Sequence, residues 1–261
     1  MAAPNLAPPP TFRSIAKAQQ WAASAYPHIT WDLAGFHVDA ANEVLQEFHR
    51  LARDWPEVLQ RLRFVGTYRK VKAAGSGYRW NPRTFAHASV DGARIGFNPA
   101  WFGNPARMRA ALSRNVATLF HPLGTEAMAS VLTHEWGHQV DHWLQKRALD
   151  ALTPGAPTSQ TVPTTASMLA HFRRYNMATR ALSQYALVNE AEGFAEAFAS
   201  LRYTPPPQQT EFTRRLGKLL ELVRGPVYDL TTLPAWNTLA PGDQAAALAR
   251  IDEIRNALGV P

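Results

Sequence analysis

Two early segments of the chain, residues 15–26 and 39–62, carry apolar side chains at helical spacing. Pro56 interrupts the second segment, because proline lacks the backbone N–H that a helix interior requires. The pattern therefore predicts helices over 15–26 and 39–53 and a shorter one over 56–63. The apolar face of the second helix is expected to consist of Ala41, Val44, Leu45, Phe48, Leu51 and Ala52.

The next section changes to short apolar runs that are typical of strands and are separated by glycine-rich or polar links. These runs are FVGTYRKV (64–71), TFAHASV (84–90) and ARIGFN (93–98). Asp91 and Gly92 lie between the last two runs. Asp-Gly is favoured in a type I′ hairpin turn, in which both central residues have positive φ. A small sheet with a hairpin at this dipeptide is therefore expected.

Helical spacing returns over 125–149, where Thr125 is placed to cap the helix and Glu126 to interact favourably with its dipole. Composition then predicts a loop over 153–165. Further helices are expected over 166–183, 189–203, 208–224 and 243–258.

Pro205–Pro207 follow the helix at 189–203 and indicate a stiff linker. We therefore divide the chain into a flexible proline-rich tail (1–12), a domain (13–203) and a helical C-terminal extension (204–261). Because the strands precede a run of helices, the expected fold class is α+β.

Composition narrows the functional classes. The chain has 261 residues, 46% of them hydrophobic, and no cysteine, which excludes disulfides, thiolate ligands and cysteine nucleophiles. The net charge is +7, but the basic residues are scattered and no nucleic-acid-binding motif is present, so a nucleic-acid partner is not favoured. Prolines near the N-terminus replace the apolar run of a signal peptide, and no apolar run is long enough to span a membrane. We expect a soluble protein; a cytoplasmic and a virion-associated or delivered location both stay open.

The stretch THEWGH places His134 and His138 four positions apart, so on a helix both imidazoles project from one face and can bind one metal ion. Zinc is favoured for this ligand type. Glu135 is close enough to act as general base on a metal-bound water. This HExxH arrangement is what zinc-assisted peptide hydrolysis requires. One stripe of the helix is expected to face inward, formed by Ala127, Val131, His134, His138 and Asp141.

A catalytic zinc ion needs a third protein ligand. The metzincin pattern would place glycine and histidine where this chain has Asp141 and Leu144, which excludes that class. His142 lies at the edge of the inward stripe and is not favoured as a ligand. The other candidates are read as ordinary surface or core histidines: His87, His121 and His171.

A second helical stretch, VNEAEGFAEAFASL, supplies the better candidate for the third ligand. Glu192 and Glu196 are four positions apart in an apolar helix, where like charges repel and carboxylates need partners. A zinc ion and its histidines would be those partners, with Glu192 as ligand and Glu196 accepting a hydrogen bond from a ligand imidazole. Glu190 competes, because Asn-Glu opens the third-ligand motif of thermolysin-like enzymes, but only Glu192 is followed by a carboxylate four positions later.

HEWGHQVD followed by SQYALVNEAEGFAEAFA resembles the zincin-like metallopeptidase domains of anthrax lethal factor, bacterial toxins and phage head-associated proteins, which are gluzincins. The resemblance covers about residues 13–203. It implies zinc ligands His134, His138 and Glu192, with Glu135 as general base. It also implies that the hydroxyl of Tyr185 stabilises the oxyanion. Asp141 is a further candidate to support the ligands through a hydrogen bond.

The resemblance also implies a small twisted sheet whose edge strand packs on the active-site helix. ARIGFN (93–98) resembles the edge strand along which zincins bind their substrate. Gly193 is a departure, because the family usually has a bulky aromatic residue there, and the packing behind Glu192 is expected to be looser. The loop at 150–165 is long enough to form one wall of a substrate cleft.

The sequence thus favours a zinc-dependent endopeptidase acting on a protein substrate, and the resemblance places it in a phage-associated or toxin and effector context. The alternative is a virion or secretion-system protein that uses a zincin fold for assembly, without proteolytic activity. The ligand set does not favour this alternative, because every expected catalytic position is filled.

Overall fold

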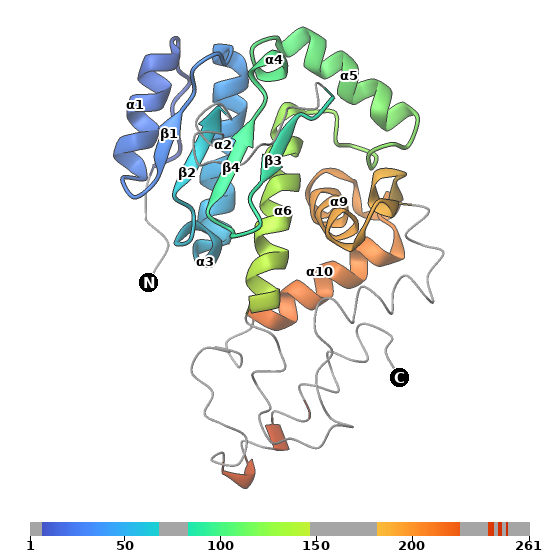
Figure 1. Ribbon diagram of the computed structural model, residues 1–261. Coiled ribbons are helices and arrows are strands. Elements are labelled where there is room, and N and C mark those ends of the chain that lie inside the picture. The colour runs from blue at the N-terminus through green and yellow to red at the C-terminus, as the bar shows by residue number, and fades with distance from the viewer. Residues whose placement is uncertain are drawn as a thin grey trace.

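The computed structural model describes residues 7–67, 83–146 and 182–224, with a few residues between 240 and 249 (Figure 1). The loop expected at 153–165 and His171 lie outside the described residues, as do nearly all of the helix expected at 166–183 and most of the one at 243–258. The described elements are α1 (Ile15–Ala25), β1 (Thr30–Asp32), α2 (Val38–Asp54), α3 (Pro56–Leu59), β2 (Phe64–Thr67), β3 (Ala86–Ala88), β4 (Arg94–Phe97), α4 (Pro99–Phe102), α5 (Pro105–Ala117), α6 (Met128–Lys146), η4 (Tyr185–Leu187), α9 (Glu190–Tyr203), η5 (Pro206–Gln208) and α10 (Glu211–Arg224). These elements confirm the α+β class.

The N-terminal helices follow the predicted apolar pattern. Ser14 caps α1, because its side chain accepts a hydrogen bond from the backbone N–H of Lys17. Helix α2 ends at Asp54, and α3 begins at Pro56, which occupies the first turn of a helix without loss of a hydrogen bond. The predicted division at Pro56 is confirmed, although α3 ends at Leu59, before the expected residue 63.

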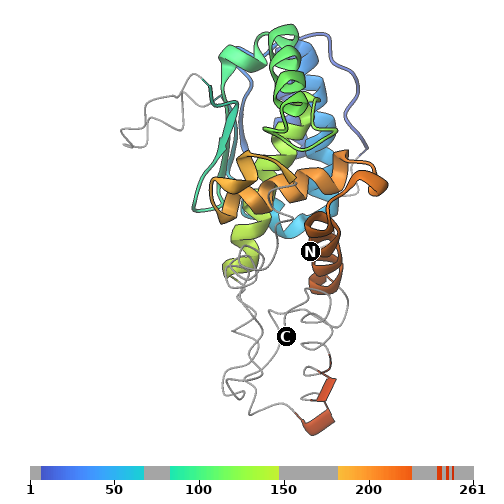
Figure 2. The same cartoon turned by 90° about the vertical axis from the view of Figure 1, so that its right-hand side faces the viewer.

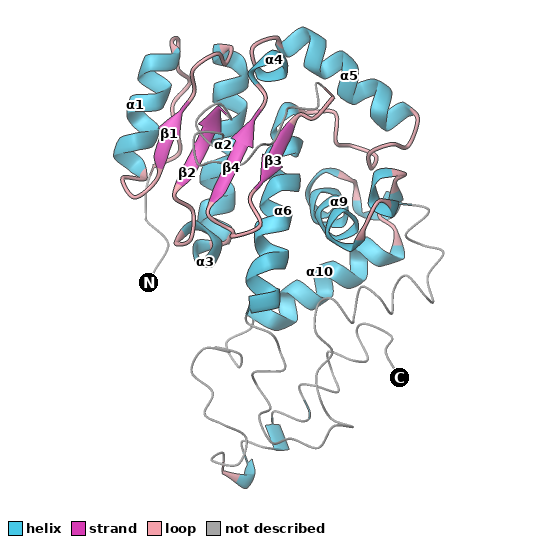
Figure 3. Ribbon diagram, in the orientation of Figure 1, coloured by secondary structure: helices cyan, strands magenta, loops and turns pink. Residues whose placement is uncertain are grey.

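Four strands form one mixed sheet in the order β1-β2-β4-β3 (Figure 3). Strands β1, β2 and β4 are parallel neighbours, and β3 pairs antiparallel with β4. The prediction that ARIGFN is the edge strand is wrong, because β4 pairs on both sides. The hairpin folds the preceding strand onto the outer side of β4, so β3 is one of the two edge strands of the described sheet and β1 is the other.

The hairpin between β3 and β4 is confirmed, but its turn is not type I′. Gly92 has a φ of 74°, whereas Asp91 does not have positive φ. The backbone N–H of Gly92 donates to the carbonyl of Ser89, so Val90 and Asp91 are the central residues and Gly92 follows them. This longer loop, a turn followed by a left-handed glycine, is a common alternative connection in hairpins.

Helix α6 begins at Met128, two residues later than a cap at Thr125 would require. Thr125 lies in the preceding turn, and its hydroxyl donates to the carbonyl of Pro122. Ser130, in the first turn of the helix, donates its hydroxyl to the carbonyls of Thr125 and Ala127. The predicted cap is therefore wrong, because the side chain of Thr125 is used within the turn.

Helices α2 and α6 cover one face of the sheet (Figure 2). They pack through Trp136 of α6, whose ring meets Phe48 of α2 edge-on with centroids 5.3 Å apart. Helix α9 packs extensively against α6, and α10 packs on α9. Phe212 and Leu216 of α10 belong to the same buried cluster as the rest of the core, while the domain boundary at 203 stays a prediction.

The helices of the described ranges include none with the length and apolar character needed to cross a bilayer.

Candidate metal centre

Helices α6 and α9 bring His134, His138 and Glu192 together. The helical spacing of the two histidines places their Nε2 atoms 3.1 Å apart. Oε2 of Glu192 lies 3.0 Å from Nε2 of His134 and 3.3 Å from Nε2 of His138. Asn189 fixes the start of α9, since its side-chain oxygen accepts a hydrogen bond from the backbone N–H of Glu192. The predicted ligand set therefore converges at one point.

The three donor atoms fit a metal ion. Ligand atoms about 2.0–2.1 Å from a tetrahedral zinc ion lie roughly 3.3 Å from one another, close to the separations found between these three side chains. The three side chains are only 12%, 18% and 18% exposed, so they are held in place by their surroundings. This His, His and Glu group could hold a metal ion, and imidazole with carboxylate is a donor set that zinc accepts.

The electrostatics of Glu192 favour its charged form. Burial alone would raise the pKa of Glu192, but hydrogen bonds and charge from His134 and His138 outweigh it and hold the pKa well below its usual range. Glu192 is therefore a carboxylate, the form that binds a cation.

Gly137 allows α9 to approach α6 closely. A Cβ atom at this position would lie 2.9 Å from the Cα of Ala195 and 3.1 Å from the Cβ of Phe198. Both neighbours belong to α9, so any larger residue would push the two helices apart. The glycine within HEWGH thus has a structural reason: it lets Glu192 reach the histidines.

Glu196 lies behind the three donor atoms and is 2% exposed. Its Oε1 atom is 2.8 Å from Nδ1 of His134 and 3.1 Å from Nδ1 of His121, and its Oε2 atom accepts a 2.8 Å hydrogen bond from the hydroxyl of Ser183. Burial raises the pKa of Glu196, but the hydrogen bonds and charges of His121 and His134 lower it to about 2. The predicted contact between Glu196 and a ligand imidazole is present.

His121 and Ser183 both contact Glu196, although His121 is read from the sequence as an ordinary surface or core histidine and no sequence pattern points to Ser183. His121 lies in the connection between α5 and α6. Backbone hydrogen bonds between this connection and the start of η4 hold His121 next to α9. Gln184 and Tyr185 donate their backbone N–H groups to the carbonyls of Leu119 and Phe120. Leu119 has a φ of 55°, in the left-handed region that leucine rarely adopts. This non-local pairing leaves no signature in the spacing of residues.

Tyr185 begins η4 and lies beside the ligands. Its ring centroid is 5.9 Å from that of His134 and 5.5 Å from that of His121. Burial and the negative charge of Glu192 raise the pKa of Tyr185, so its hydroxyl keeps its proton. Gly193 permits this arrangement, because a Cβ there would come within 3.1 Å of the carbonyl oxygen of Ala186. The departure at Gly193 thus lets η4 lie close to α9.

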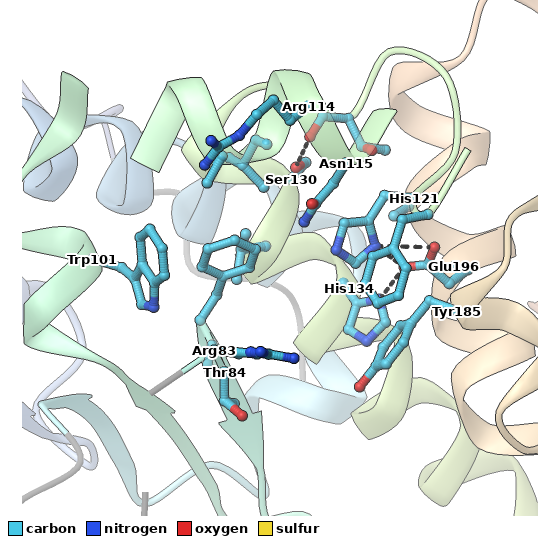
Figure 4. Close-up of a pocket in the computed structure, with 18 of the residues that line it drawn as sticks. Arg83, Thr84, Trp101, Arg114, Asn115, His121, Ser130, His134, Tyr185 and Glu196 are labelled. Carbon is cyan, nitrogen blue, oxygen red and sulfur yellow. Dashed lines mark hydrogen bonds and ion pairs between the residues drawn. The ribbon is translucent and has the colours of Figure 1, made fainter. Parts of the chain in front are cut away.

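Glu135 is buried, and it lines a cavity of about 540 Å³ together with His134 and Tyr185 (Figure 4). Burial raises the pKa of Glu135 above its usual value, while the charges of nearby histidines oppose the shift. The cavity extends from His134 towards α4, α5 and β3. Its apolar wall includes Phe85, Ala86, Trp101, Leu112 and Val131.

The remaining predicted residues lie around this centre. His142 is outside it, because its Cδ2 atom is 2.8 Å from the position of a Cβ on Gly92, in the hairpin. Asp141 is buried one turn beyond His138, and its support of the ligands stays a prediction. Glu190 is the first residue of α9, and Glu192, two positions later, is the carboxylate that belongs to the metal-binding group of the described residues.

Comparison with known proteins finds no relative: no protein-family model, no curated protein and no solved structure matches the chain. The resemblance to zincin-like domains therefore rests on the two stretches of sequence that carry it. Any function must be inferred from the chemistry of the site.

Proposed function

We propose that this chain is a zinc-dependent endopeptidase that hydrolyses peptide bonds of a protein substrate. The observation that carries the proposal is that His134, His138 and Glu192 converge on one point, and that His134 also lines a cavity together with Glu135 and Tyr185. A binding site for a structural metal ion alone needs neither a buried carboxylate nor a phenol directed at the same space. These two groups are the ones that amide hydrolysis requires in addition to the metal.

In this proposal a zinc ion held by His134, His138 and Glu192 would lower the pKa of a water molecule and polarise the carbonyl group of the substrate. The carboxylate of Glu135 takes a proton from the attacking water and later gives it to the nitrogen of the leaving amine. The hydroxyl of Tyr185 keeps its proton and donates a hydrogen bond to the carbonyl oxygen as negative charge develops on it. Glu196 holds the ring of His134 in one orientation throughout.

The surroundings of the centre suit an extended peptide. Strand β3 is one of the two edge strands of the described sheet and contacts α6, so a substrate could add to the sheet as a further strand beside it. The adjoining cavity has an apolar wall in which Phe85 and Trp101 meet edge-on, with centroids 4.9 Å apart. A substrate side chain would be desolvated there, beside the bond to be cleaved.

Zinc content and peptide hydrolysis test the proposal together. We expect wild type to contain one zinc ion per chain and to cleave members of a peptide library. Glu135→Gln should keep the zinc and lose activity by a factor of about 10² to 10⁴, the usual contribution of a general base. Glu126→Gln is the matched control, because Glu126 is exposed and does not line the cavity of the metal centre.

Two results would count against an endopeptidase. Undiminished cleavage by Glu135→Gln would show that Glu135 is not the general base, and would contradict the proposed mechanism. Stoichiometric zinc without cleavage of any library peptide would instead favour the assembly protein with a zincin fold.

A further inference from the structure

His121 shares a buried carboxylate with the first metal-binding histidine. Its Nδ1 atom lies 3.1 Å and 3.3 Å from the two oxygens of Glu196, while Nδ1 of His134 lies 2.8 Å from one of them. Figure 4 shows both imidazoles turned towards Glu196, with Tyr185 beside them. Because a carboxylate accepts hydrogen bonds, both rings present an N–H on Nδ1 to Glu196.

The ring of His121 is fixed by aromatic neighbours as well as by Glu196. Its centroid lies 5.1 Å from that of Phe120 and 5.5 Å from that of Tyr185, and both pairs are edge-on. Phe85 contributes a third, tilted contact at 6.4 Å. The orientation of the imidazole is therefore set before any substrate arrives, which is the condition for a specific hydrogen bond.

Nε2 of His121 is available to a ligand. All hydrogen bonds of the side chain with the described part of the chain use Nδ1, and His121 lines the cavity together with His134, Glu135 and Tyr185. It is not a member of the metal-binding group. In a neutral imidazole with its proton on Nδ1, Nε2 is a hydrogen-bond acceptor. A peptide lying in the cavity offers backbone N–H groups as donors.

We propose that His121 is a substrate-binding residue whose Nε2 atom accepts a hydrogen bond from a backbone N–H of the peptide substrate. This inference rests on the proposed endopeptidase function and adds a contact on the substrate main chain. The other reading is that His121 only positions Glu196. Ser183 separates the two readings, because it also donates to Glu196 but is 1% exposed and does not line the cavity.

The test compares His121→Phe with Ser183→Ala in the zinc-loaded, full-length protein. His121→Phe keeps a ring against Phe120 and Tyr185 but has no nitrogen, and we expect KM to rise about 3- to 10-fold with kcat changed less than 2-fold. His121→Gln supplies an amide that can donate to Glu196 and accept from the substrate, and should recover part of the loss. Zinc content and Tm show whether each variant is folded and loaded.

The sharper measurement replaces single backbone amides of a cleaved peptide by esters, away from the scissile bond. An ester removes one N–H donor with little change of shape. In wild type, an ester at one position should raise KM by about the same factor as His121→Phe does with the all-amide peptide. With the His121→Phe variant, the ester at that position should raise KM no further. Ser183→Ala should retain the ester penalty in full.

The possible failures are distinct. Ester penalties that are the same in His121→Phe and wild type at every position would overturn the role of His121 and leave the endopeptidase intact. A lower zinc affinity with unchanged KM in His121→Phe would likewise overturn it, in favour of positioning through Glu196. Absence of hydrolysis by wild type would overturn the proposed function, and this contact falls with it.

Discussion

Two buried glutamates contact neighbouring residues of α6 from different sides, and each accepts several hydrogen bonds. Glu196 of α9 is held by His121, His134 and Ser183. Glu47 of α2 accepts two hydrogen bonds from Arg50, of 2.5 Å and 3.0 Å, and one of 2.6 Å from the hydroxyl of Thr133. Both carboxylates therefore join α6 to another helix.

The two networks differ in what their donors can do beyond the carboxylate. Arg50 is a permanent cation that neutralises Glu47 and also bonds Asp54 at 2.9 Å, and Tyr203 of α9 interacts with Glu47 and Thr133, so this network joins protein groups to one another. The donors to Glu196 include two imidazoles, each of which has a second nitrogen directed elsewhere. A buried carboxylate thus has a structural role when its hydrogen-bond partners interact only with other protein groups. It has a functional role when one of those partners can also bind a ligand.

The largest expected effect is on stability, from Glu47→Ala. The substitution removes the partner of a partly buried arginine and of Thr133, which should lower the free energy of unfolding by about 3 kcal/mol. Urea unfolding of the zinc-saturated protein measures this loss. The affinity of the folded protein for zinc should change less than about 3-fold, and a larger drop would show that Glu47 serves the metal centre too.

Glu196→Gln, in contrast to Glu47→Ala, should affect zinc binding more than stability. We expect zinc affinity to fall by about 10- to 100-fold, because the amide no longer orients His134 as a carboxylate does. Competition with a chelator gives the dissociation constant, and Glu126→Gln serves as the surface control. A variant that binds zinc as tightly as wild type would place Glu196 in the same structural class as Glu47.

Gly137→Ala tests the contact on which the metal centre depends. The added methyl group overlaps Ala195, so α9 must shift, and we expect a destabilisation of about 1–2 kcal/mol together with weaker zinc binding. Gly217→Ala is the control, since the three atoms nearest to a Cβ there belong to the flexible side chain of Leu201 and not to backbone. Equal effects of the two substitutions on zinc affinity would contradict the special role of Gly137.

The smallest expected effect is the pH dependence of the stability that Glu47 contributes. Burial alone would raise the pKa of Glu47, but the hydrogen bonds and charge of Arg50, with the hydrogen bond from Thr133, lower it below its usual value of about 4.3. As pH falls, the carboxyl group of Glu47 is protonated in the unfolded state before it is protonated in the folded state. Its stabilisation of the fold is therefore complete above the pKa of Glu47 in the unfolded chain, and is lost as pH falls through its pKa in the folded protein. The stability difference between wild type and Glu47→Gln should therefore narrow below about pH 4, by urea unfolding at several pH values. A gap that widens on acidification would contradict this assignment.

Local chemistry made part of the site predictable. The spacing of His134 and His138 and the pair Glu192 and Glu196 follow from helical geometry, and the structure brings the first three of these side chains together. His121 could not be found in this way, since it reaches Glu196 through backbone pairing between distant loops.

The fold shows the same division. The elements near Pro56 and the hairpin at Asp91-Gly92 were predictable, because proline and glycine act on their own neighbours. The place of β4 inside the sheet was not, because strand order depends on which edge a hairpin covers. Likewise Thr125 has the residue type of a cap, but its hydroxyl bonds Pro122 instead.

Native mass spectrometry of three proteins tests the central claim, that α6 and α9 together bind one metal ion, most directly. Wild type and Glu190→Ala should each carry one zinc ion per chain. Glu192→Ala should lose it under the same conditions, because the oxygen that lies 3.0 Å from Nε2 of His134 has been removed. Zinc retained by Glu192→Ala, or lost by Glu190→Ala instead, would contradict the metal centre described here.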